Sequence, residues 1–413
     1  MDAIILAAGK SKRMYPLTVE KPKGILKIAN KSIIQHNLEQ LEGLVDKAII
    51  IVGHGREYIL NHFPKEYKGL GLTYMEQWPQ LGTWHALDRA RYSTSDRFIV
   101  LMGDDLYSKK DIKSCIEKEF AILTTNKVND KKRFGIVNEH NGKFMHVFEK
   151  EDKEILGLID DNTLVNCGLY VLNKKVFEYN LGISKRAEFE LTTLIEEFSK
   201  KNEIDVVKVQ DYWIPINYPW DLLNTNEFLL KRMLDYKIDG IIASNVTIDG
   251  LSIVIGKGTE VKSGAYIEGP VIIGKNCKIG PRAYIRGCTS IGNNCRINAE
   301  VKNSIIGDNT NLSHQSIYVG DSIIGDDCNL GAGTITANSK HDGKNIRSII
   351  YREVIAKEGI KFNREIVDTG RTKFGTVIGD RTKLGIGTKI RPGRKIWLDK
   401  LTEEGQVVKE DLI

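Results

Sequence analysis

Features that mark several other classes of protein are scarce in this sequence or missing from it. The six cysteines are scattered, without a Cys-x-x-Cys pair or a cluster of cysteine and histidine, which argues against a zinc site. They are typical of buried thiols in a reducing compartment. No segment approaches a membrane span, and the short apolar run at the start lacks the form of a signal peptide. We therefore expect a cytoplasmic protein.

A strong charge of one sign is missing as well. The net charge of +6 is spread over 413 residues, and no basic tract is interleaved with aromatic residues, so the sequence does not point to nucleic acid. A chain of this length exceeds what one hydrophobic core usually fills, and two domains are expected. The 38 glycines indicate many turns.

The first part of the chain alternates short apolar runs with amphipathic stretches. This alternation predicts the α/β class, with a mostly parallel sheet covered by helices, over a first domain of residues 1–219. Phosphate-binding segments in such sheets lie where the carboxyl end of a strand turns into a loop. The expected strands include residues 3–7, 47–52, 72–76 and 98–102, and the expected helices include residues 32–44 and 82–92.

A helical linker at 220–238 precedes a different pattern, which fills residues 239–395 and leaves 396–413 as a tail. An aliphatic or aromatic residue recurs at every sixth position, with one slip of phase. A solenoid explains this period, because each coil buries its apolar residue against the coils above and below. Glycine often follows that position, where a tight corner excludes a Cβ. The recurring residues are Ile255, Val261, Ile267, Ile273, Ile279, Ile285, Ile291, Ile297, Ile306, Leu312, Tyr318, Ile324 and Leu330.

This period resembles the hexapeptide repeat of left-handed β-helix acyltransferases. The resemblance implies a carboxyl-terminal left-handed parallel β-helix with three-sided coils, assembled as a homotrimer. The left hand comes from the resemblance alone, because general rules for strand connections favour the right hand.

The first predicted strand runs into a loop that carries glycine and several cations. A glycine-bearing turn after a buried strand exposes backbone N–H groups to a triphosphate, and Arg13 and Lys23 supply positive charge for its transition state. The segment reads LAAGKSKRM from Leu6, then PLT and KPK, and it resembles the signature loop of sugar-1-phosphate nucleotidylyltransferases. The resemblance implies a Rossmann-like domain in which Leu6, Ala8 and Gly9 bind the nucleotide, with Arg13 and Lys23 as catalytic residues.

Further segments match that family in the expected order. The resemblance implies displacement of pyrophosphate from a nucleoside triphosphate, UTP or dTTP, by the phosphate oxygen of a sugar-1-phosphate, with Mg²⁺ bound between phosphates. The residues implied are Gln80, Gly82 and Thr83 for the nucleobase, Asp104 and Asn217 for the metal, and Gly135, Glu149 and Asn166 for the sugar phosphate.

Two departures from the family pattern lie in this half. Ser11 and Lys12 stand where the family usually has a second glycine and a threonine, and a Cβ reduces how closely backbone approaches a phosphate. Trp84 follows Thr83, where the family has glycine or alanine. Its indole is expected to crowd the nucleobase or to stack on it.

The second half resembles a particular acyltransferase branch. Asp321, Gly325 and the string NLGAGTITAN from Asn329 resemble the glucosamine-1-phosphate N-acetyltransferase domain of the bifunctional bacterial enzyme, and the following residues look more like its archaeal counterparts. The resemblance implies acetyl-CoA as co-substrate and His314 as general base. The implied substrate-binding residues are Arg286, Lys302, Tyr318, Asn338, Lys344 and Arg347, with basic residues of 369–375 near the phosphates of CoA.

The spacing around the histidine differs from the family by one residue. The family reads His-x-x-Tyr-x-Gly-Asp, whereas here three residues separate His314 from Tyr318, and Gln315 stands at the family's histidine spacing. A local bulge would restore the geometry.

Three hypotheses follow from these patterns. The first is a bifunctional enzyme that acetylates glucosamine-1-phosphate and then transfers uridylyl to give UDP-N-acetylglucosamine. The second keeps only nucleotidylyl transfer to glucose-1-phosphate, with the β-helix serving trimerisation or regulation. The third is a regulatory subunit that binds a sugar nucleotide without catalysis.

Overall fold

The computed structural model describes residues 1–128, 130–148, 159–184, 187–356 and 359–413. Two compact units share the chain. The first comprises Met1–Lys10, Lys21–Ile25 and Ile33–Pro215, and the second comprises Ser11–Glu20, Leu26–Ser32 and Ile216–Ile413. Part of the segment that resembles the signature loop therefore belongs to the second unit.

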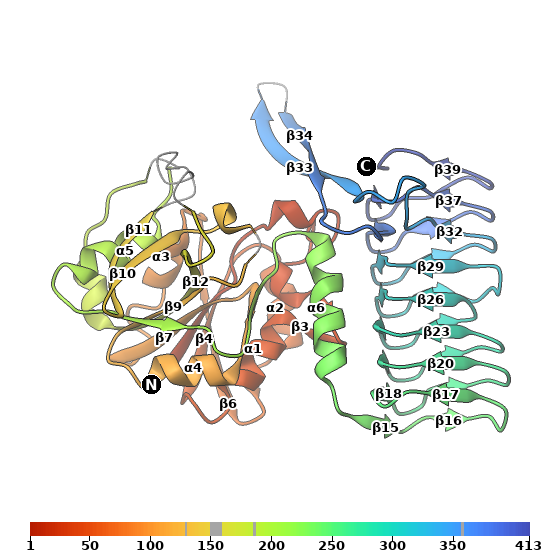
Figure 1. Ribbon diagram of the computed structural model, residues 1–413, viewed down its shortest axis with the longest axis horizontal. Coiled ribbons are helices and arrows are strands. Elements are labelled where there is room, and N and C mark those ends of the chain that lie inside the picture. The colour runs from red at the N-terminus through yellow and green to blue at the C-terminus, as the bar shows by residue number, and fades with distance from the viewer. Residues whose placement is uncertain (129, 149–158, 185–186, 357–358) are drawn as a thin grey trace. The chain divides into compact units, whose positions relative to one another are not determined.

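The first unit is built on a ten-stranded sheet with the order β10-β11-β13-β9-β12-β7-β1-β4-β6-β5. The strands β7, β1, β4 and β6 are parallel neighbours, and β12 runs antiparallel to β7 and β9 (Figure 1). This arrangement confirms the predicted Rossmann-like domain with a mixed sheet. The strands are β1 (Asp2–Leu6), β4 (Lys47–Val52), β5 (Glu66–Tyr67), β6 (Leu70–Glu76), β7 (Arg97–Met102), β9 (Ala121–Thr125), β10 (Ile136–His140), β11 (Lys143–Phe148), β12 (Leu164–Asn173) and β13 (Asp205–Lys208).

Helices cover both faces of this sheet, because its central strands are apolar on both sides. Along β1, Ile4 and Leu6 face one core, whereas Ala3 and Ile5 face the other. Side chains of α3 and α5 pack into the first core, and those of α1, α2 and α4 into the second. The helices are α1 (Ile33–Leu41), α2 (Arg56–His62), α3 (Thr83–Asp88), α4 (Lys109–Ile116) and α5 (Leu191–Ser199), and a two-stranded sheet joins β8 (Asp105–Tyr107) to β14 (Trp213–Pro215).

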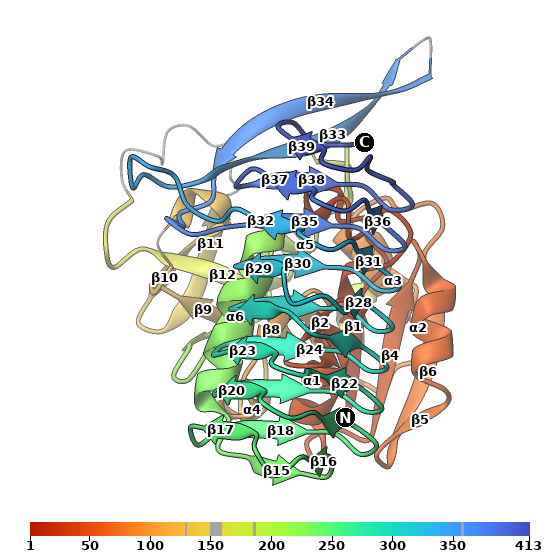
Figure 2. The same ribbon diagram turned by 90° about the vertical axis from the view of Figure 1, so that its right-hand side faces the viewer.

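The second unit is a stack of coils with three faces. Each strand pairs in parallel with the equivalent strand of the next coil. The chain therefore contributes to three sheets in turn, which have eight, seven and eight strands (Figure 2). The first sheet holds β15 (Tyr236–Ile238), β18 (Ile253–Ile255), β21 (Val271–Ile273), β24 (Thr289–Ile291), β27 (Ile305–Ile306), β30 (Ile323–Ile324), β35 (Thr376–Ile378) and β38 (Arg394–Ile396). The second holds β16 (Ile241–Ile242), β19 (Glu260–Val261), β22 (Lys278–Ile279), β25 (Arg296–Ile297), β28 (Asn311–Leu312), β31 (Asn329–Leu330) and β36 (Lys383–Leu384). The third holds β17 (Thr247–Asp249), β20 (Tyr266–Glu268), β23 (Tyr284–Arg286), β26 (Glu300–Lys302), β29 (Tyr318–Gly320), β32 (Ile335–Thr336), β37 (Lys389–Ile390) and β39 (Val407–Val408).

The residues of the sixfold period fill the inside of this stack, with one exception. Twelve of the thirteen predicted positions are buried, whereas Tyr318 is only half-buried and Val319 takes its place in the core. The prediction for Tyr318 was wrong because the turn from Leu312 to Val319 is one residue longer than the turn from Ile279 to Ile285. The extra residue shifts the phase by one and points Tyr318 outward.

Glycine at the corners lets successive coils approach closely. A Cβ on Gly274 would lie 2.5 Å from the carbonyl oxygen of Gly292 in the next coil, and one on Gly307 would lie 2.5 Å from that of Gly325. Close stacking is therefore the reason for glycine at these corners.

Three further elements complete the second unit. The helix α6 (Pro219–Arg232) runs beside the coils and contacts β24 (Figure 1). The hairpin of β33 (Arg347–Ala356) and β34 (Gly359–Asp368) is inserted between β32 and β35 and extends away from the stack (Figure 2). The stretch 396–413 includes β39, which pairs with β37. In the described ranges, every helix is too short or too polar to cross a membrane.

Candidate active sites

The first unit gathers several predicted nucleotide-binding residues where β1 ends. Leu6 lies between Ile51 of β4 and Met102 of β7, so three strand ends meet there. The carbonyl oxygen of Ala8 accepts hydrogen bonds from the backbone N–H of His54 at 3.1 Å and from Nε2 of Gln80 at 3.2 Å. Gln80 thus contacts the signature segment, and its role toward the nucleobase stays a prediction.

Lys23 and Asp104 form an ion pair beside these strand ends. Nζ of Lys23 lies 2.8 Å from Oδ2 of Asp104, and the lysine side chain is 6% exposed while the aspartate is 41% exposed. The neighbouring Asp105 instead accepts a hydrogen bond from Nε1 of Trp213 at 3.2 Å. Asp104 therefore keeps an exposed carboxylate after the strand β7 while it pairs with Lys23.

The predicted nucleobase loop is held by close packing and by the start of α5. A Cβ on Gly82, where φ is 113°, would lie 2.4 Å from the carbonyl oxygen of Phe189, so only glycine fits. Oγ1 of Thr83 accepts a hydrogen bond from the backbone N–H of Leu191 at 2.9 Å. Gln77, which sequence reasoning missed, donates to the carbonyl oxygen of Gly82 at 2.8 Å.

Trp84 is a core residue in this structure. Its side chain is buried and stacks on Phe177 with ring centroids 5.9 Å apart. The expectation that the indole crowds the nucleobase was therefore wrong, because the α-helix α3 turns this position into the hydrophobic core. The next side chain, His85, has a lowered pKa because of burial and the nearby positive charge of Arg89.

The segments predicted to bind the sugar phosphate meet at an irregularity of β12. The carbonyl oxygen of Gly135 accepts a hydrogen bond from the backbone N–H of Asn166 at 2.9 Å. The register of β12 against β9 shifts between Asn166 and Tyr170, and the two side chains are joined by a hydrogen bond of 2.6 Å. Such bulges often turn side chains toward a site. Glu149 lies outside the described residues.

Arg13 and Asn217 belong to the second compact unit, and their place at the phosphate site stays a prediction. The side chain of Arg13 is exposed, and the backbone N–H of Asn217 donates to Oδ2 of Asp221 at 2.8 Å. Ser11 has a φ of 48°, a left-handed conformation that favours glycine. A glycine would adopt this conformation without the cost that the Cβ of Ser11 adds.

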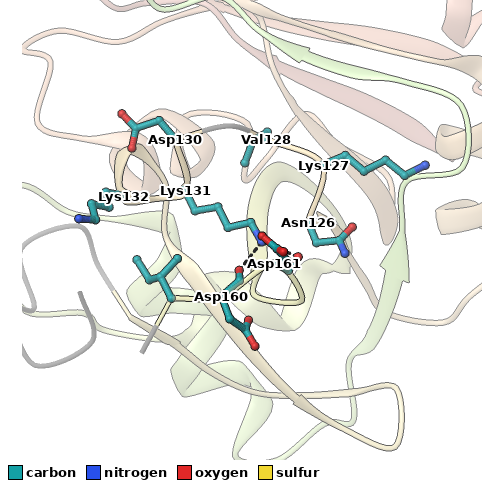
Figure 3. A pocket seen from close by; sticks show the side chains of 9 residues that line it. Asn126, Lys127, Val128, Asp130, Lys131, Lys132, Asp160 and Asp161 are labelled. Atoms are coloured by element: carbon teal, nitrogen blue, oxygen red, sulfur yellow. Dashed lines mark hydrogen bonds between the residues drawn. The ribbon is translucent and has the colours of Figure 1, made fainter. Parts of the chain in front are cut away.

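A separate pocket of about 610 Å³ opens beyond the end of β9 (Figure 3). Within it, Nζ of Lys131 donates to the carbonyl oxygens of Asp160 and Asp161 at 2.6 and 2.7 Å. None of the residues predicted from the sequence lines this pocket. Its lining comprises Asn126, Lys127, Val128, Asp130, Lys131, Lys132, Ile159, Asp160 and Asp161.

In the second unit, the cations predicted to bind the acetyl-acceptor phosphate lie side by side on the third sheet. Arg286 of β23 pairs in register with Lys302 of β26, which pairs with Gly320 of β29. Nη1 of Arg286 donates to Oε1 of Glu300 at 3.1 Å. Lys302 has no ion-pair partner among the residues that the structure describes. The charge of Lys302 is therefore less neutralised by neighbouring carboxylates than the charge of Arg286.

Asp321 organises the neighbouring part of this site. Its buried carboxylate accepts hydrogen bonds of 2.7 Å from Nδ2 of both Asn338 and Asn303, and it pairs with Arg371 at 3.4 Å. Asn338 also approaches the hydroxyl of Tyr318 at 3.4 Å. Sequence reasoning missed Asn303. Arg371 contacts Asp321, and the expectation that basic residues of 369–375 lie near the phosphates of CoA stays a prediction.

The pKa of Tyr318 is raised by burial and by the carboxylates of Glu300 and Asp321. Its hydroxyl therefore stays protonated near neutral pH and remains a hydrogen-bond donor. A neutral hydroxyl at this place suits contact with a sugar hydroxyl or an amine.

His314 lies in the lengthened turn between β28 and β29. Its side chain is exposed, and its carbonyl oxygen accepts a hydrogen bond from Ile317 at 3.1 Å. Gln315 beside it reaches the carbonyl oxygen of Pro281 at 3.4 Å. Lys344 and Arg347 are exposed at the start of the hairpin. The roles of these residues in acetyl transfer stay predictions.

Two families match the chain, one in each half. The Nucleotidyl transferase family matches residues 2–232, which is more than half of the chain. The GMPPB C-terminal domain family matches residues 267–373.

Relatives of similar length match nearly all of it. The bifunctional protein GlmU of Methanococcus maripaludis is 37% identical over 100% of this chain and 95% of its own length. A bifunctional sugar-1-phosphate nucleotidylyltransferase/acetyltransferase of Sulfurisphaera tokodaii is 34% identical over 100% of this chain and 98% of its own. A solved UDP-glucose pyrophosphorylase complexed with UDP-glucose covers 56% of this chain with a TM-score of 0.50 and 19% identity, which shows the fold alone.

Proposed function

Since the chain belongs to the family of bifunctional sugar-1-phosphate nucleotidylyltransferase/acetyltransferases, we propose that it makes UDP-N-acetylglucosamine in two steps. The first step acetylates glucosamine-1-phosphate, and the second transfers uridylyl from UTP to the product. The observation that carries this proposal is that each unit holds its own hydrogen-bonded cluster of functional residues. These clusters are Lys23 with Asp104, and Asp321 with Asn338.

Uridylyl transfer is an in-line displacement. A phosphate oxygen of the sugar phosphate attacks the α-phosphorus of UTP, the new P–O bond forms, and the bond to pyrophosphate breaks. Lys23 and Arg13 offset the negative charge that grows in the transition state, and the backbone around Ala8 and Gly9 approaches the phosphates. Gln80, Gly82 and Thr83 hold the nucleobase. Gly135 and Asn166 hold the sugar phosphate, together with Glu149.

Asp104 and Asn217 would hold Mg²⁺, which when bound lowers the repulsion between the phosphates and the attacking oxygen. The donors suit this ion, because Mg²⁺ prefers oxygen ligands and usually takes only one or two from the protein beside substrate phosphates. Asp104 turns one carboxylate oxygen to Lys23 and presents an exposed edge.

Acetyl transfer needs a base rather than a metal. The amine of glucosamine-1-phosphate attacks the thioester carbonyl of acetyl-CoA, a C–N bond forms, and the C–S bond breaks to release the thiol of CoA. His314 takes the proton that the amine loses. Arg286 and Lys302 bind the phosphate, and Tyr318 with Asn338 orients the amino sugar. Lys344 and Arg347 also contribute to substrate binding.

The assembly proposed for the second unit follows the same family. We propose that its coils wind left-handed and that three copies assemble into a homotrimer. The proposed location is the cytoplasm, where UTP and acetyl-CoA are present. The nucleobase choice between UTP and dTTP is part of the proposal.

Two release assays test these activities on the full chain. Pyrophosphate is measured with UTP or dTTP and a panel of sugar-1-phosphates, and CoA thiol is measured with acetyl-CoA and glucosamine-1-phosphate. Both products are expected, with UTP as the better triphosphate. Pyrophosphate without amine-dependent thiol would favour the uridylyl- or thymidylyltransferase alternative, which the lengthened turn at His314 supports. Release of neither product would leave only a binding protein.

The general base is tested by a matched pair of variants in the lengthened turn. His314→Ala is expected to lower thiol release by about 10²- to 10⁴-fold, the usual contribution of general base catalysis. Gln315→Ala changes the adjacent exposed residue and should leave the rate unchanged. A wild-type rate in His314→Ala together with a loss in Gln315→Ala would show that His314 is not the general base.

A further inference from the structure

The segment Ser11–Glu20 carries Arg13, yet it packs within the second compact unit. Met14 to Thr18 are buried, whereas Arg13 is exposed. The short helix η1 (Lys12–Met14) contacts the hairpin strand β33. The backbone around Arg13 is therefore fixed by what Met14 to Thr18 touch.

An aromatic cluster holds Tyr15. Its ring meets that of Trp397 edge to face, with centroids 6.3 Å apart, and Trp397 meets Tyr351 in the same way at 4.7 Å. All three side chains are buried. Such pairs contribute roughly 0.5–1.5 kcal/mol beyond the burial of their area.

Lys395 supplies the polar anchor of this cluster. Its side chain is fully buried, and Nζ donates to the main-chain carbonyl oxygen of Tyr15 at 3.0 Å. Nζ also lies 5.8 Å from the ring centre of Tyr351, and the backbone N–H of Lys395 donates to Asp411. An apolar side chain would fill this space without the large desolvation cost of an ammonium group. The carbonyl of Tyr15 is thus the specific contact that the lysine adds.

A second anchor holds the other end of the segment. The guanidinium of Arg381 binds both carboxylate oxygens of Glu20 at 3.0 and 3.1 Å, and Asp399 at 2.7 and 2.8 Å. Lys395 and Arg381 both lie on the last coils, so these coils bind the segment Ser11–Glu20 at Tyr15 and at Glu20.

We propose that Lys395 is a positioning residue for uridylyl transfer, because it fixes the backbone two residues after Arg13. The inference rests on the proposed function, in which Arg13 acts on the phosphates of UTP. It gives the last coils a part in the reaction of the nucleotidyltransferase domain, beyond the acetyl transfer assigned to the coil stack.

Lys395→Met keeps the length and volume of the side chain and removes the ammonium. Loss of a fixed geometry around Arg13 is expected to lower kcat for pyrophosphate release by about 10- to 100-fold. KM for UTP should change less, since the contact acts in the transition state. Thiol release from acetyl-CoA by the same protein should stay at the wild-type rate, and Tm should not fall. Lys383→Met, which alters an exposed lysine of a neighbouring coil, is the matched control.

A double-mutant cycle separates positioning from a general structural role. In an Arg13→Ala background, assayed with enough enzyme to measure pyrophosphate, Lys395→Met should change the rate less than twofold if it acts through Arg13. Equal fold-losses in both backgrounds would overturn the inference, as would a wild-type kcat in the single variant. Should Lys395→Met lose both activities, Arg381→Gln tests the same segment through Glu20 and must lower only pyrophosphate release. A wild-type protein that releases no pyrophosphate would instead refute the proposed function.

Discussion

Gly320 offers a way to disturb the proposed acetyltransferase site without touching a functional group. A Cβ at this position would lie 2.6 Å from the hydroxyl of Tyr318 and 2.7 Å from Nδ2 of Asn338. Ordinary contact begins near 3.4 Å, so Gly320→Ala should push these two groups away by about 0.8 Å. The atoms displaced are the ends of side chains, and the backbone of Gly320 is not left-handed, so the coil itself should fold.

A displacement of about 1 Å at a reacting centre costs on the order of 10²-fold in rate. We therefore expect thiol release from acetyl-CoA to fall by about 10- to 100-fold in Gly320→Ala, while pyrophosphate release stays at the wild-type rate. Gly182→Ala is the control, because a Cβ there meets nothing within 4 Å. Wild-type thiol release in Gly320→Ala, at a concentration of glucosamine-1-phosphate below KM, would refute the placement of the amino sugar on Tyr318 and Asn338.

Three other predictions concern the metal, the core and a buried charge. Chelation of divalent cations should abolish pyrophosphate release and spare thiol release, and Asp104→Asn should raise the Mg²⁺ concentration needed for half-maximal pyrophosphate release; equal sensitivity of both reactions to chelation would contradict the assignment. Trp84→Ala should lower the free energy of unfolding by about 3–5 kcal/mol, because a buried indole is lost. The ratio of the rates with UTP and dTTP should stay unchanged. An altered ratio would show that the indole does contact the nucleobase. Burial lowers the pKa of Lys395 to about 8, with Asp411 opposing and Arg394 adding to the shift. Between that value and the ordinary 10.5 this lysine binds more protons in the unfolded chain than in the folded chain, so its own contribution to stability should rise with pH by about 3 kcal/mol in that window. Lys395→Met should lack this rise. The difference in Tm between the variant and the wild type should therefore be smaller, or of opposite sign, at pH 10 than at pH 7.5.

Periodicity predicted most of the buried positions inside the coils of the second unit. Each coil buries an apolar side chain at the same place, so buried positions such as Ile279 and Ile297 can be found by counting six residues at a time. A corner glycine such as Gly274 is explained by the close approach of the next coil. The strand at Lys47–Val52 was also predicted with its exact bounds, because a buried parallel strand is apolar on both faces. The helix expected at 82–92 ends at Asp88 instead, since turns take over the remaining residues.

Features that depend on contacts between residues distant in sequence could not be predicted from the sequence. Trp84 follows a loop motif, and only the packing of α3 against Phe177 shows that its indole belongs to the core. Arg371 lies 50 residues beyond Asp321, and an inserted hairpin had to be traced before the two could be joined. The sixfold count also failed at Tyr318, because one extra residue in a turn leaves no mark in a sequence until the register of the strands is known.

That extra residue has an unequal effect on the two sides of the turn. Beyond it, the register of β29 with β26 is intact, so Tyr318 lies over Glu300 and Gly320 over Lys302. Arg286, Lys302 and Tyr318, which we propose bind the substrate, therefore keep the fixed spacing of a sheet, and the insertion is confined to the turn. His314 lies within the turn, outside the paired strands, and its side chain is exposed. If acetyl transfer is slow in this protein, the physical cause should lie in the orientation of the base and not in substrate binding, and the rate loss should appear in kcat with KM for glucosamine-1-phosphate preserved.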